Sequence, residues 1–427
     1  LAGAPVRLTL VDRQNYHSFQ PLLYQVATAS LSPADIASPI RSVLKRQRNT
    51  EVWLGEVVDV DVEGRRVILK DGVVDYDYLV VATGVTHTYF GHEEWAALAP
   101  GLKTMDDALE LRRRFLLAFE TAEREGDPAA RRRALTTVIV GGGPTGAELA
   151  GAMAEIARES ILKDFRFIDT ATARIILLEG ADRVLPAYPE PLSAKARRQL
   201  ERLGVTVRTG ALVTAVDEQG VWLGGERIEA GNVFWAAGVQ ASHLGRSLGA
   251  ELDRVGRVHV ADDLSVPGHP EVLVIGDLAH IQQDGRTLPG VAQVALQGGR
   301  HAARLIRAEL NGKPRKPFRY RDKGNLATIG RAAAVADLGR LRLSGLPAWL
   351  IWVFIHILYL IGFRNRILVM LQWAWAWATY QRGIRLITGR PTLRLERARP
   401  ASGASDVAAV PGPAARPAAR PGHKQML

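Results

Sequence analysis

The stretch Thr137-Val-Ile-Val-Gly-Gly-Gly-Pro-Thr-Gly-Ala-Glu-Leu-Ala-Gly151 decides the fold of this chain. It joins a β-branched strand to a helical segment through the pattern G-x-G-x-x-G, formed by Gly141, Gly143 and Gly146. The first glycine permits a tight turn, the second lets a pyrophosphate approach the backbone, and the third allows close packing of helix against strand. Flanked by a strand and a helix that extends to about Leu162, the pattern predicts a dinucleotide-binding unit.

The next predicted strand, Ile175 to Leu178, ends at Glu179. An acid there accepts hydrogen bonds from a ribose 2′-hydroxyl and repels a 2′-phosphate, so we expect NADH rather than NADPH. Glu179 follows the glycines by more than the usual ~20 residues, which requires a longer helix or an insertion around Lys163 to Thr172. A helix at Leu192 to Leu203 and a strand at Val205 to Val207 then continue a right-handed, doubly wound βαβ domain.

Asp12 repeats this arrangement near the start of the chain, because it follows the apolar strand Val6 to Val11. A lone acid at a strand end is more often a cap, but two such acids imply two dinucleotides. The glycine loop expected before Asp12 is absent, and the chain begins at Leu1 without methionine. We therefore interpret the sequence as a fragment that opens inside a fold.

Two further segments favour a flavin as the second nucleotide. Ala82-Thr83-Gly84 follows a buried strand and has a counterpart in Ala236-Ala237-Gly238. Asp277 follows the apolar strand Val272 to Ile275, where it could hold a ribityl hydroxyl, although an isolated Gly-Asp pair is usually a turn.

Composition restricts the chemistry. The 427 residues suffice for two to three domains. The absence of cysteine excludes disulfide frameworks, thiolate metal sites, iron–sulfur clusters and thiol relays, so redox chemistry requires a bound organic cofactor. The net charge of +11 is concentrated in residues 313–400, next to the most apolar part of the chain. This placement favours an anionic membrane surface over nucleic acid.

Leu346 to Phe363 is a run of 18 residues without charge, with two arginines on each side. As a helix it would be roughly 27 Å long, borderline for a ~30 Å hydrocarbon core. A second segment, Ile367 to Tyr380, contributes three of the five tryptophans found between positions 349 and 377, and tryptophan favours the headgroup interface. We expect a monotopic helical hairpin in one leaflet; a spanning helix and a soluble core helix are the alternatives.

With these residues the chain resembles the type II NADH dehydrogenases, single-chain FAD enzymes that pass electrons from NADH to a membrane quinone without pumping protons. The resemblance covers Val6 to about Gly389. It rests on Asn15-Tyr-His-Ser-Phe-Gln-Pro-Leu-Leu-Tyr-Gln-Val-Ala27, Ala82-Thr-Gly84, the glycine loop with Glu148, Gly276-Asp277, Ala292-Gln-Val-Ala-Leu-Gln-Gly-Gly299 and Lys323-Gly-Asn-Leu-Ala-Thr-Ile-Gly330.

The resemblance implies a role for each match. Gln293 and Gln297, four residues apart on a predicted helix, look like a quinone-site pair, although two polar residues on a solvated face would have the same spacing. Glu148 is similar to an acid near the nicotinamide and flavin, and Lys323 to a residue contacting the flavin region. The residues assigned to cofactor binding are Asp12, Arg13, Ala82, Thr83, Gly84, Asp277, Lys323, Gly141, Gly143, Gly146, Glu179 and Gly238.

The expected organisation is an α/β protein with two Rossmann-like domains. Residues 1–104 and 241–338 form a discontinuous FAD domain, 105–240 the NADH domain, 339–397 the membrane-association helices, and 398–427 a disordered tail. We expect it at the cytoplasmic face of the cell membrane, with a homodimer compatible with the sequence. The alternatives are a soluble NADH-dependent ferredoxin-type reductase, which would not need the tryptophan-rich segment, and a non-catalytic NAD(H)-binding redox sensor.

Overall fold

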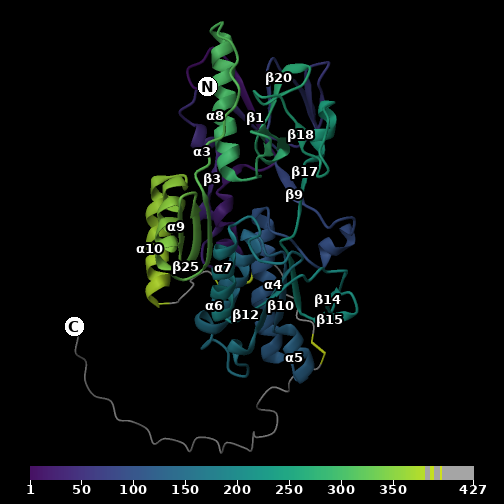
Figure 1. The fold of residues 1–427 in the computed structure, drawn as a ribbon, viewed down its shortest axis with the longest axis vertical. Helices are drawn as coiled ribbons and strands as arrows, with labels where there is room; N and C mark the ends of the chain where they lie inside the picture. The colour runs from purple at the N-terminus through teal and green to yellow at the C-terminus, as the bar shows by residue number, and fades with distance from the viewer. Residues whose placement is uncertain (380–384, 389–394, 397–427) are drawn as a thin grey trace, which may run out of the picture.

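The computed structural model describes residues 1–379, 385–388 and 395–396. Within these ranges the chain forms an upper and a lower α/β part joined by two short strands, β9 (Val85–His87) and β17 (Val239–Ala241) (Figure 1). The predicted disordered tail lies outside the described residues. The two joining strands pair antiparallel, so the chain crosses between the parts twice at one place.

The upper part contains two parallel strand pairs. β1 (Leu8–Asp12) pairs with β4 (Thr50–Leu54), and β8 (Leu79–Val81) pairs with β20 (His269–Val274). Helix α8 (Ala292–Leu310) packs on β20 through a buried cluster that contains Leu273, Ala302, Leu305 and Ile306. The first 80 residues also contain β2 (Tyr16–Ser18), α1 (Leu23–Ala27), α2 (Pro33–Ile36), β3 (Ala37–Pro39), α3 (Ile40–Leu44), β5 (Val57–Asp61), β6 (Arg66–Leu69) and β7 (Gly72–Asp75). Of these, α1 and α2 pack in the core of the lower part rather than the upper part.

The short elements β18 (Val258–His259), β19 (Ser265–Val266) and β21 (Ala279–His280) complete the upper part around β20. A separate hairpin is formed by β22 (Gln282–Gln283) and β23 (Arg286–Thr287).

The lower part is built on a parallel sheet in the order β12-β11-β10-β16, as the doubly wound pattern predicts. Its two central strands, Thr136–Val140 and Arg174–Glu179, are mainly apolar, because both faces of the sheet are buried there. The elements of this part are α4 (Met105–Arg124), α5 (Pro128–Ala134), β10 (Thr136–Val140), α6 (Pro144–Glu155), β11 (Arg174–Glu179), α7 (Glu190–Arg202), β12 (Val205–Thr209), an antiparallel sheet of β13 (Ala215–Asp217), β14 (Gly220–Leu223) and β15 (Glu226–Glu229), and β16 (Asn232–Trp235).

The predicted elements of the lower part are confirmed with one difference. The helix after the glycine loop ends as α6 at Glu155 rather than near Leu162, and a π-helical turn covers Ile156–Ser160. The insertion expected from the long spacing between the glycine loop and Glu179 is present. It is a loop between α6 and β11 that contains a short 3₁₀ turn at Thr170–Thr172.

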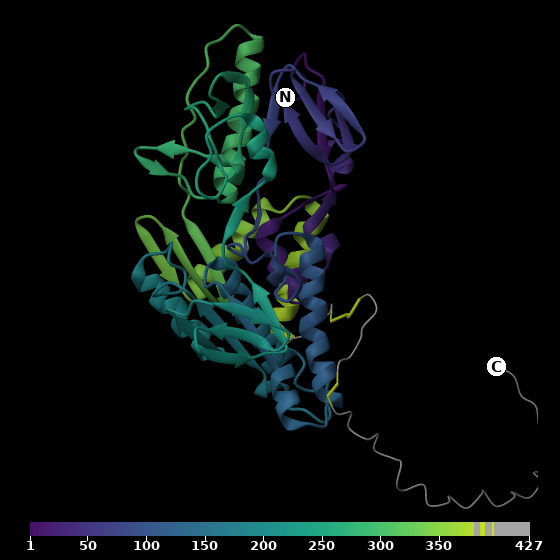
Figure 2. The same cartoon turned by 90° about the vertical axis from the view of Figure 1, so that its right-hand side faces the viewer.

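A third, antiparallel sheet consists of β24 (Asn325–Gly330), β25 (Ala333–Leu338) and β26 (Leu341–Ser344). It lies beside the helices of the lower part (Figure 2). The contact with α6 is very close, because a Cβ atom on Gly151 would lie 1.6 Å from the carbonyl oxygen of Ile329. Glycine is therefore required at this crossing.

Two helices follow this sheet: α9 (Leu346–Tyr359) and α10 (Phe363–Thr379), which we call the helical hairpin. Trp352 and Ala348 of α9 are buried, whereas four apolar residues at four-residue intervals are exposed: Leu346, Leu350, Phe354 and Leu358. Among the described residues, neither helix is long and apolar enough to cross a bilayer.

Candidate functional site

The glycine loop has the geometry of a phosphate cradle. Gly141 has a φ of +107°, and a Cβ atom there would lie 2.6 Å from the backbone of Ala236. A Cβ atom on Gly146 would lie 1.8 Å from the carbonyl oxygen of Gly141, so helix and loop pack without room for a side chain. Gly143, by contrast, faces open space at the start of α6. The free N-terminus of the helix and this open face fit a pyrophosphate.

Glu179 is fixed against the same loop. Its carboxylate accepts one hydrogen bond from the Gly142 backbone N–H at 2.6 Å and another from Ala181 at 2.8 Å. Each of these hydrogen bonds uses one lone pair on one of the two carboxylate oxygens. Since a carboxylate has about four such acceptor sites, Glu179 can still accept hydrogen bonds from ribose hydroxyls. Gly142 and Glu179 lie close together because β10 and β11 are parallel neighbours and each residue lies at the carboxyl end of its strand.

The second predicted nucleotide site is assembled in the same way. Ala82-Thr83-Gly84 follows β8, and Gly276-Asp277 follows β20, the parallel neighbour in which Val81 pairs with Val274. Gly84 has a φ of +67° and open space around its Cα, and Ala82 and Thr83 are exposed. Because ligands of such sheets bind at the carboxyl ends of the strands, this edge fits a flavin nucleotide.

Asp12 ends β1, where its side chain accepts a 2.8 Å hydrogen bond from the backbone of Gln14, while Arg13 is exposed. Asp12 is thus partly engaged in a local turn, and its carboxylate can still accept further hydrogen bonds.

Gly238 directly precedes β17, one of the two strands that join the upper and lower parts. It has a φ of +74°, and a Cβ atom there would lie 2.5 Å from the Phe90 ring. The positive φ favours glycine at this position more than the close contacts do, because the neighbouring atoms are ends of side chains and not backbone.

Asp277 lies at the N-terminal end of α8, next to Gly290, where a Cβ atom would lie 3.4 Å from the Asp277 carboxyl carbon. Burial raises the pKa of Asp277, and the charges of Lys103 and Arg257 oppose this rise. Burial also lowers the pKa of Lys103, against the effect of Asp277. The sequence analysis did not identify Lys103, because it lies in a loop just before α4 and only the fold brings it to Asp277.

Glu148 lies in the second turn of α6 and faces the third sheet. Its carboxyl group accepts a hydrogen bond from the Thr328 backbone N–H in β24, and burial raises its pKa to about 8. The residue therefore carries its proton at neutral pH. A protonated carboxyl group donates a hydrogen bond as well as accepting one, which suits a residue near a reacting centre.

Gln293 and Gln297 lie on one face of α8, as predicted, but they have different partners. Gln297 exchanges two hydrogen bonds with the backbone of Arg321: its amide donates to the carbonyl at 2.9 Å, and its oxygen accepts from the N–H at 3.0 Å. Gln297 thus holds the segment that carries Lys323. Gln293 instead hydrogen-bonds to the phenol of Tyr359.

Lys323 is exposed and donates a hydrogen bond to the same phenol at 3.2 Å. The pKa of Tyr359 is lowered by its hydrogen bonds to Lys323 and Gln293 and by the nearby positive charges of Lys323 and Arg300. Tyr359, the last residue of α9, was missed by the sequence analysis because it ends an apolar run in which no side chain is marked as functional.

These sites fit the two nucleotides predicted. The open face at Gly143 with Glu179 fits NADH, and the edge formed by Thr83, Gly84 and Asp277 fits the flavin of FAD. Neither site includes a metal cluster: the described residues contain no group of three or more potential metal ligands.

Two family models match the chain. One, described as pyridine nucleotide-disulphide oxidoreductase, matches residues 1–299, and the other, the NDH2 C-terminal domain, matches residues 323–378. The chain is 46% identical over 404 residues to the type II NADH:quinone oxidoreductase Ndh of Mycobacterium tuberculosis, covering 91% of this chain and 86% of that protein. It is 31% identical over 331 residues to a type II NADH:quinone oxidoreductase of Staphylococcus aureus, covering 76% and 80% respectively.

Solved structures show the same fold. NDH2 from Plasmodium falciparum in complex with NADH has a TM-score of 0.80 at 21% identity, covering 88% of this chain and 94% of that one. The sulfide:quinone oxidoreductase of Aquifex aeolicus has a TM-score of 0.63 at 17% identity, covering 84% of this chain and 86% of that one. Since this chain has no cysteine, it lacks the disulfide chemistry that gives the wider fold family its name.

Proposed function

The chain belongs to the type II NADH:quinone oxidoreductases, and on this premise we propose how its residues divide the reaction between an NADH site and a quinone site. The enzyme is FAD-dependent and moves electrons from NADH to a quinone. When bound, FAD supplies the two-electron redox chemistry that no side chain of this cysteine-free protein can supply.

In the NADH half of the reaction, the glycine loop binds the pyrophosphate at the N-terminus of α6. Glu179 accepts hydrogen bonds from the ribose and disfavours a 2′-phosphate by like-charge repulsion. Glu148, in which burial favours the protonated carboxyl group, lies in the second turn of α6 and orients the nicotinamide end. Thr83, Gly84 and Asp277 would hold the flavin at the carboxyl ends of β8 and β20, and Asp12 and Arg13 would bind the nucleotide end of FAD.

In the quinone half, Gln293 at the first turn of α8 binds the quinone head group. Lys323, which the resemblance assigns to the flavin region, lies beside it. The observation that carries this assignment is the contact of both side chains with Tyr359, the last residue of the apolar helix α9. A quinone dissolved in lipid would therefore meet polar donors at the C-terminal end of α9. Gln297 acts on the same site indirectly, by fixing the backbone beside Lys323.

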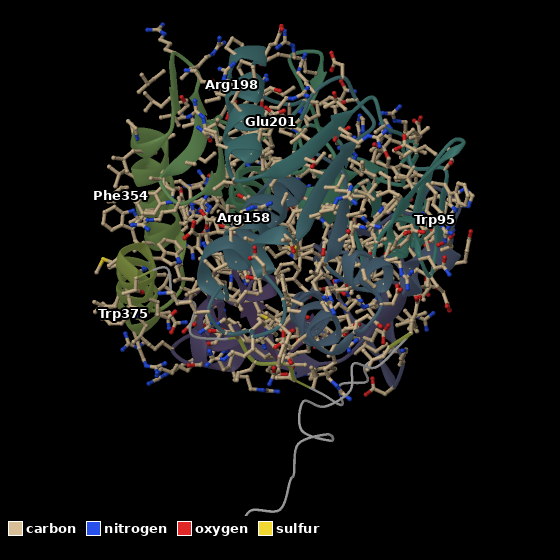
Figure 3. All side chains as sticks on the ribbon, turned by 90° about the horizontal axis from the view of Figure 1, so that it is seen from below. Trp95, Arg158, Arg198, Glu201, Phe354 and Trp375 are labelled. Atoms are coloured by element: carbon tan, nitrogen blue, oxygen red, sulfur yellow. The ribbon has the colours of Figure 1, made fainter. Side chains whose placement is uncertain are left out.

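The protein is a peripheral membrane enzyme, and we assign its lipid-facing surface to the helical hairpin. Phe354 of α9 and Trp375 of α10 both point outward on the same side of the molecule (Figure 3). Phe354 is 66% exposed and Trp375 62%, which is unfavourable in water for side chains of this size. Arg340 and Arg342, which precede the hairpin, and Arg364, in the first turn of α10, suit an anionic lipid surface at the cytoplasmic face.

A Gln293→Leu variant tests this division. We expect a raised KM or a lowered turnover with a short-chain quinone, while reduction of the flavin by NADH in a stopped-flow experiment keeps its rate. The matched control is Gln282→Leu, an exposed glutamine on the β22 hairpin. Unchanged quinone kinetics would remove Gln293 from the quinone site. Slowed flavin reduction would place it on the nicotinamide side instead.

A further inference from the structure

Phe90 is an exposed aromatic residue on a strained backbone, in the loop that follows β9. Its φ of +56° lies in the left-handed region, which a bulky residue rarely adopts, and the residue is 66% exposed. Its N–H donates to the Thr88 hydroxyl at 3.1 Å, and the preceding Tyr89 is buried with its hydroxyl donating to the Ala99 carbonyl at 2.9 Å. Strain that the surrounding structure fixes in this way is concentrated at functional sites.

The Phe90 ring lies against the segment that follows β16. A Cβ atom on Gly238 would lie 2.5 Å from the tip of this ring, and the centroid of the Trp235 ring is 6.4 Å from that of Phe90. The same segment also touches the glycine loop, because a Cβ atom on Gly141 would lie 2.6 Å from the Ala236 backbone. Phe90 is thus one chain segment away from the phosphate cradle.

The strand order shows which half of NADH is directed toward this segment. In the order β12-β11-β10-β16, the glycine loop follows β10, Glu179 ends β11 on one side, and residues 236–238 follow β16 on the other. A dinucleotide with its pyrophosphate at the loop and its adenosine ribose at Glu179 runs along the carboxyl edge of the sheet. Its nicotinamide half then extends toward β16 and Phe90.

Membrane contact does not explain why the Phe90 ring is exposed. Trp95 belongs to the same aromatic cluster, since its ring lies 5.6 Å from that of Trp235 between centroids. In Figure 3, Trp95 lies on the opposite side of the molecule from Phe354 and Trp375 of the helical hairpin. A planar aromatic ligand suits an exposed aromatic ring, because stacked and edge-to-face contacts are favourable beyond the area that they bury.

We propose that Phe90 is a further NADH-binding residue, whose ring contacts the nicotinamide half of the dinucleotide. This inference rests on the proposed NADH site at the glycine loop and Glu179. It adds to that site a side chain from the loop after β9, outside the doubly wound sheet. The strained backbone at Phe90 then holds the ring at the ligand edge of the sheet.

Phe90→Leu in the FAD-loaded protein tests the inference, because it keeps an apolar side chain and removes the ring. Stopped-flow reduction of the flavin at increasing NADH gives the dissociation constant of NADH, which should rise about 2- to 10-fold, the effect of one aromatic contact. ADP-ribose, which lacks the nicotinamide, should compete with NADH with unchanged affinity. Phe167→Leu is the matched control, since Phe167 is 49% exposed in the loop before β11, at the amino ends of the strands.

Phe90→Gly separates a binding role from a structural one. Glycine adopts a positive φ without strain, so this variant should keep the unfolding temperature of the wild type within a few degrees. Its affinity for NADH should fall at least as far as in Phe90→Leu. A much lower unfolding temperature with unchanged affinity for NADH would mean that the ring only supports the fold, which overturns the inference.

The two ligands separate the remaining explanations. Weaker binding of NADH with unchanged binding of ADP-ribose in Phe90→Leu supports the inference. Equal losses for both ligands place the ring on the adenosine half and overturn it. Unchanged affinity for both ligands also overturns it, and leaves the proposed NADH site in place if Glu179→Gln weakens the binding of ADP-ribose. Unchanged affinities in both variants overturn the proposed site and, with it, this inference.

Discussion

The indole N–H of Trp373 donates a hydrogen bond of 2.7 Å to the side-chain oxygen of Gln25, joining two residues 348 positions apart in the chain. Gln25 is only 8% exposed and also donates to the Tyr24 hydroxyl at 2.9 Å. Asn365, at the start of α10, donates to the carbonyl of Ala34 at 3.3 Å. The helical hairpin is therefore attached to the N-terminal part of the chain by partly buried hydrogen bonds as well as by apolar packing.

Replacing Trp373 with Phe should lower the free energy of unfolding by about 1–3 kcal/mol, because the buried oxygen of Gln25 loses its donor. Urea unfolding followed by circular dichroism measures this change. Trp375→Phe is the control, since Trp375 is exposed on the same helix. Equal effects of the two variants would show that the Gln25 contact contributes nothing specific.

Glu179→Gln should weaken the preference for NADH over NADPH about 10-fold, because the amide no longer repels a 2′-phosphate and accepts a weaker hydrogen bond from the ribose. The measurement is the ratio of kcat/KM for the two nucleotides. Glu229→Gln, an exposed acid on β15 of the same part, should leave the ratio unchanged. An unchanged ratio in Glu179→Gln would remove this residue from the ribose site.

Gly151→Ala should destabilise the protein by at least about 1–3 kcal/mol, because the added methyl group would collide with the Ile329 carbonyl and force α6 away from β24. Gly299→Ala is the matched control in the interior of another helix, where the nearest side-chain atom lies at 3.6 Å. There the helix propensity of alanine should raise stability by about 0.5–1 kcal/mol. Thermal unfolding of both variants tests the opposite signs, and a destabilised Gly299→Ala would contradict the contrast.

The sequence predicts those structural features that depend on residues close together in the chain better than those that depend on contacts between distant segments. The glycine loop, Glu179 and α8 (Ala292–Leu310) are predictable because each depends on residues close together in the chain. The meeting of Gly142 with Glu179 is predictable as well, since parallel strands bring their carboxyl ends to one edge.

The contacts that the sequence does not reveal all join distant segments. The spacing of Gln293 and Gln297 predicts a shared helix face, but not that Gln297 would hold the Arg321 backbone while Gln293 reaches Tyr359. The register of β24 against α6, which makes Gly151 indispensable, also depends on tertiary packing alone. Helical periodicity likewise continues through the π turn at Ile156–Ser160, which explains why the end of α6 was predicted too late.

Phe354→Ser should weaken binding to vesicles that contain anionic lipid, because one exposed aromatic side chain no longer enters the interface. Burial of a phenylalanine is worth about 1.5–3 kcal/mol, so a fall of at least about 10-fold in the partition coefficient is expected in a cosedimentation assay. Phe90→Ser is closely matched, since Phe90 is also 66% exposed but does not lie on the helical hairpin. Equal losses in both variants would exclude the hairpin as the specific membrane-binding surface.

Glu148 should make stability depend on pH in a direction opposite to that of an ordinary surface carboxylate. Its pKa is about 8 in the folded protein and near the usual 4.5 when unfolded, so between these values the folded state binds a proton that the unfolded state lacks. The free energy of unfolding therefore falls as pH rises through this range, with a limiting slope of about 1.4 kcal/mol per pH unit. Glu148→Gln, which cannot ionise, removes this contribution, whereas Glu120→Gln on the exposed face of α4 should retain it. Urea unfolding at pH 5.5, 7 and 9 measures the difference between wild type and Glu148→Gln. A difference that does not change with pH would mean that the Glu148 carboxyl group is already ionised in the fold.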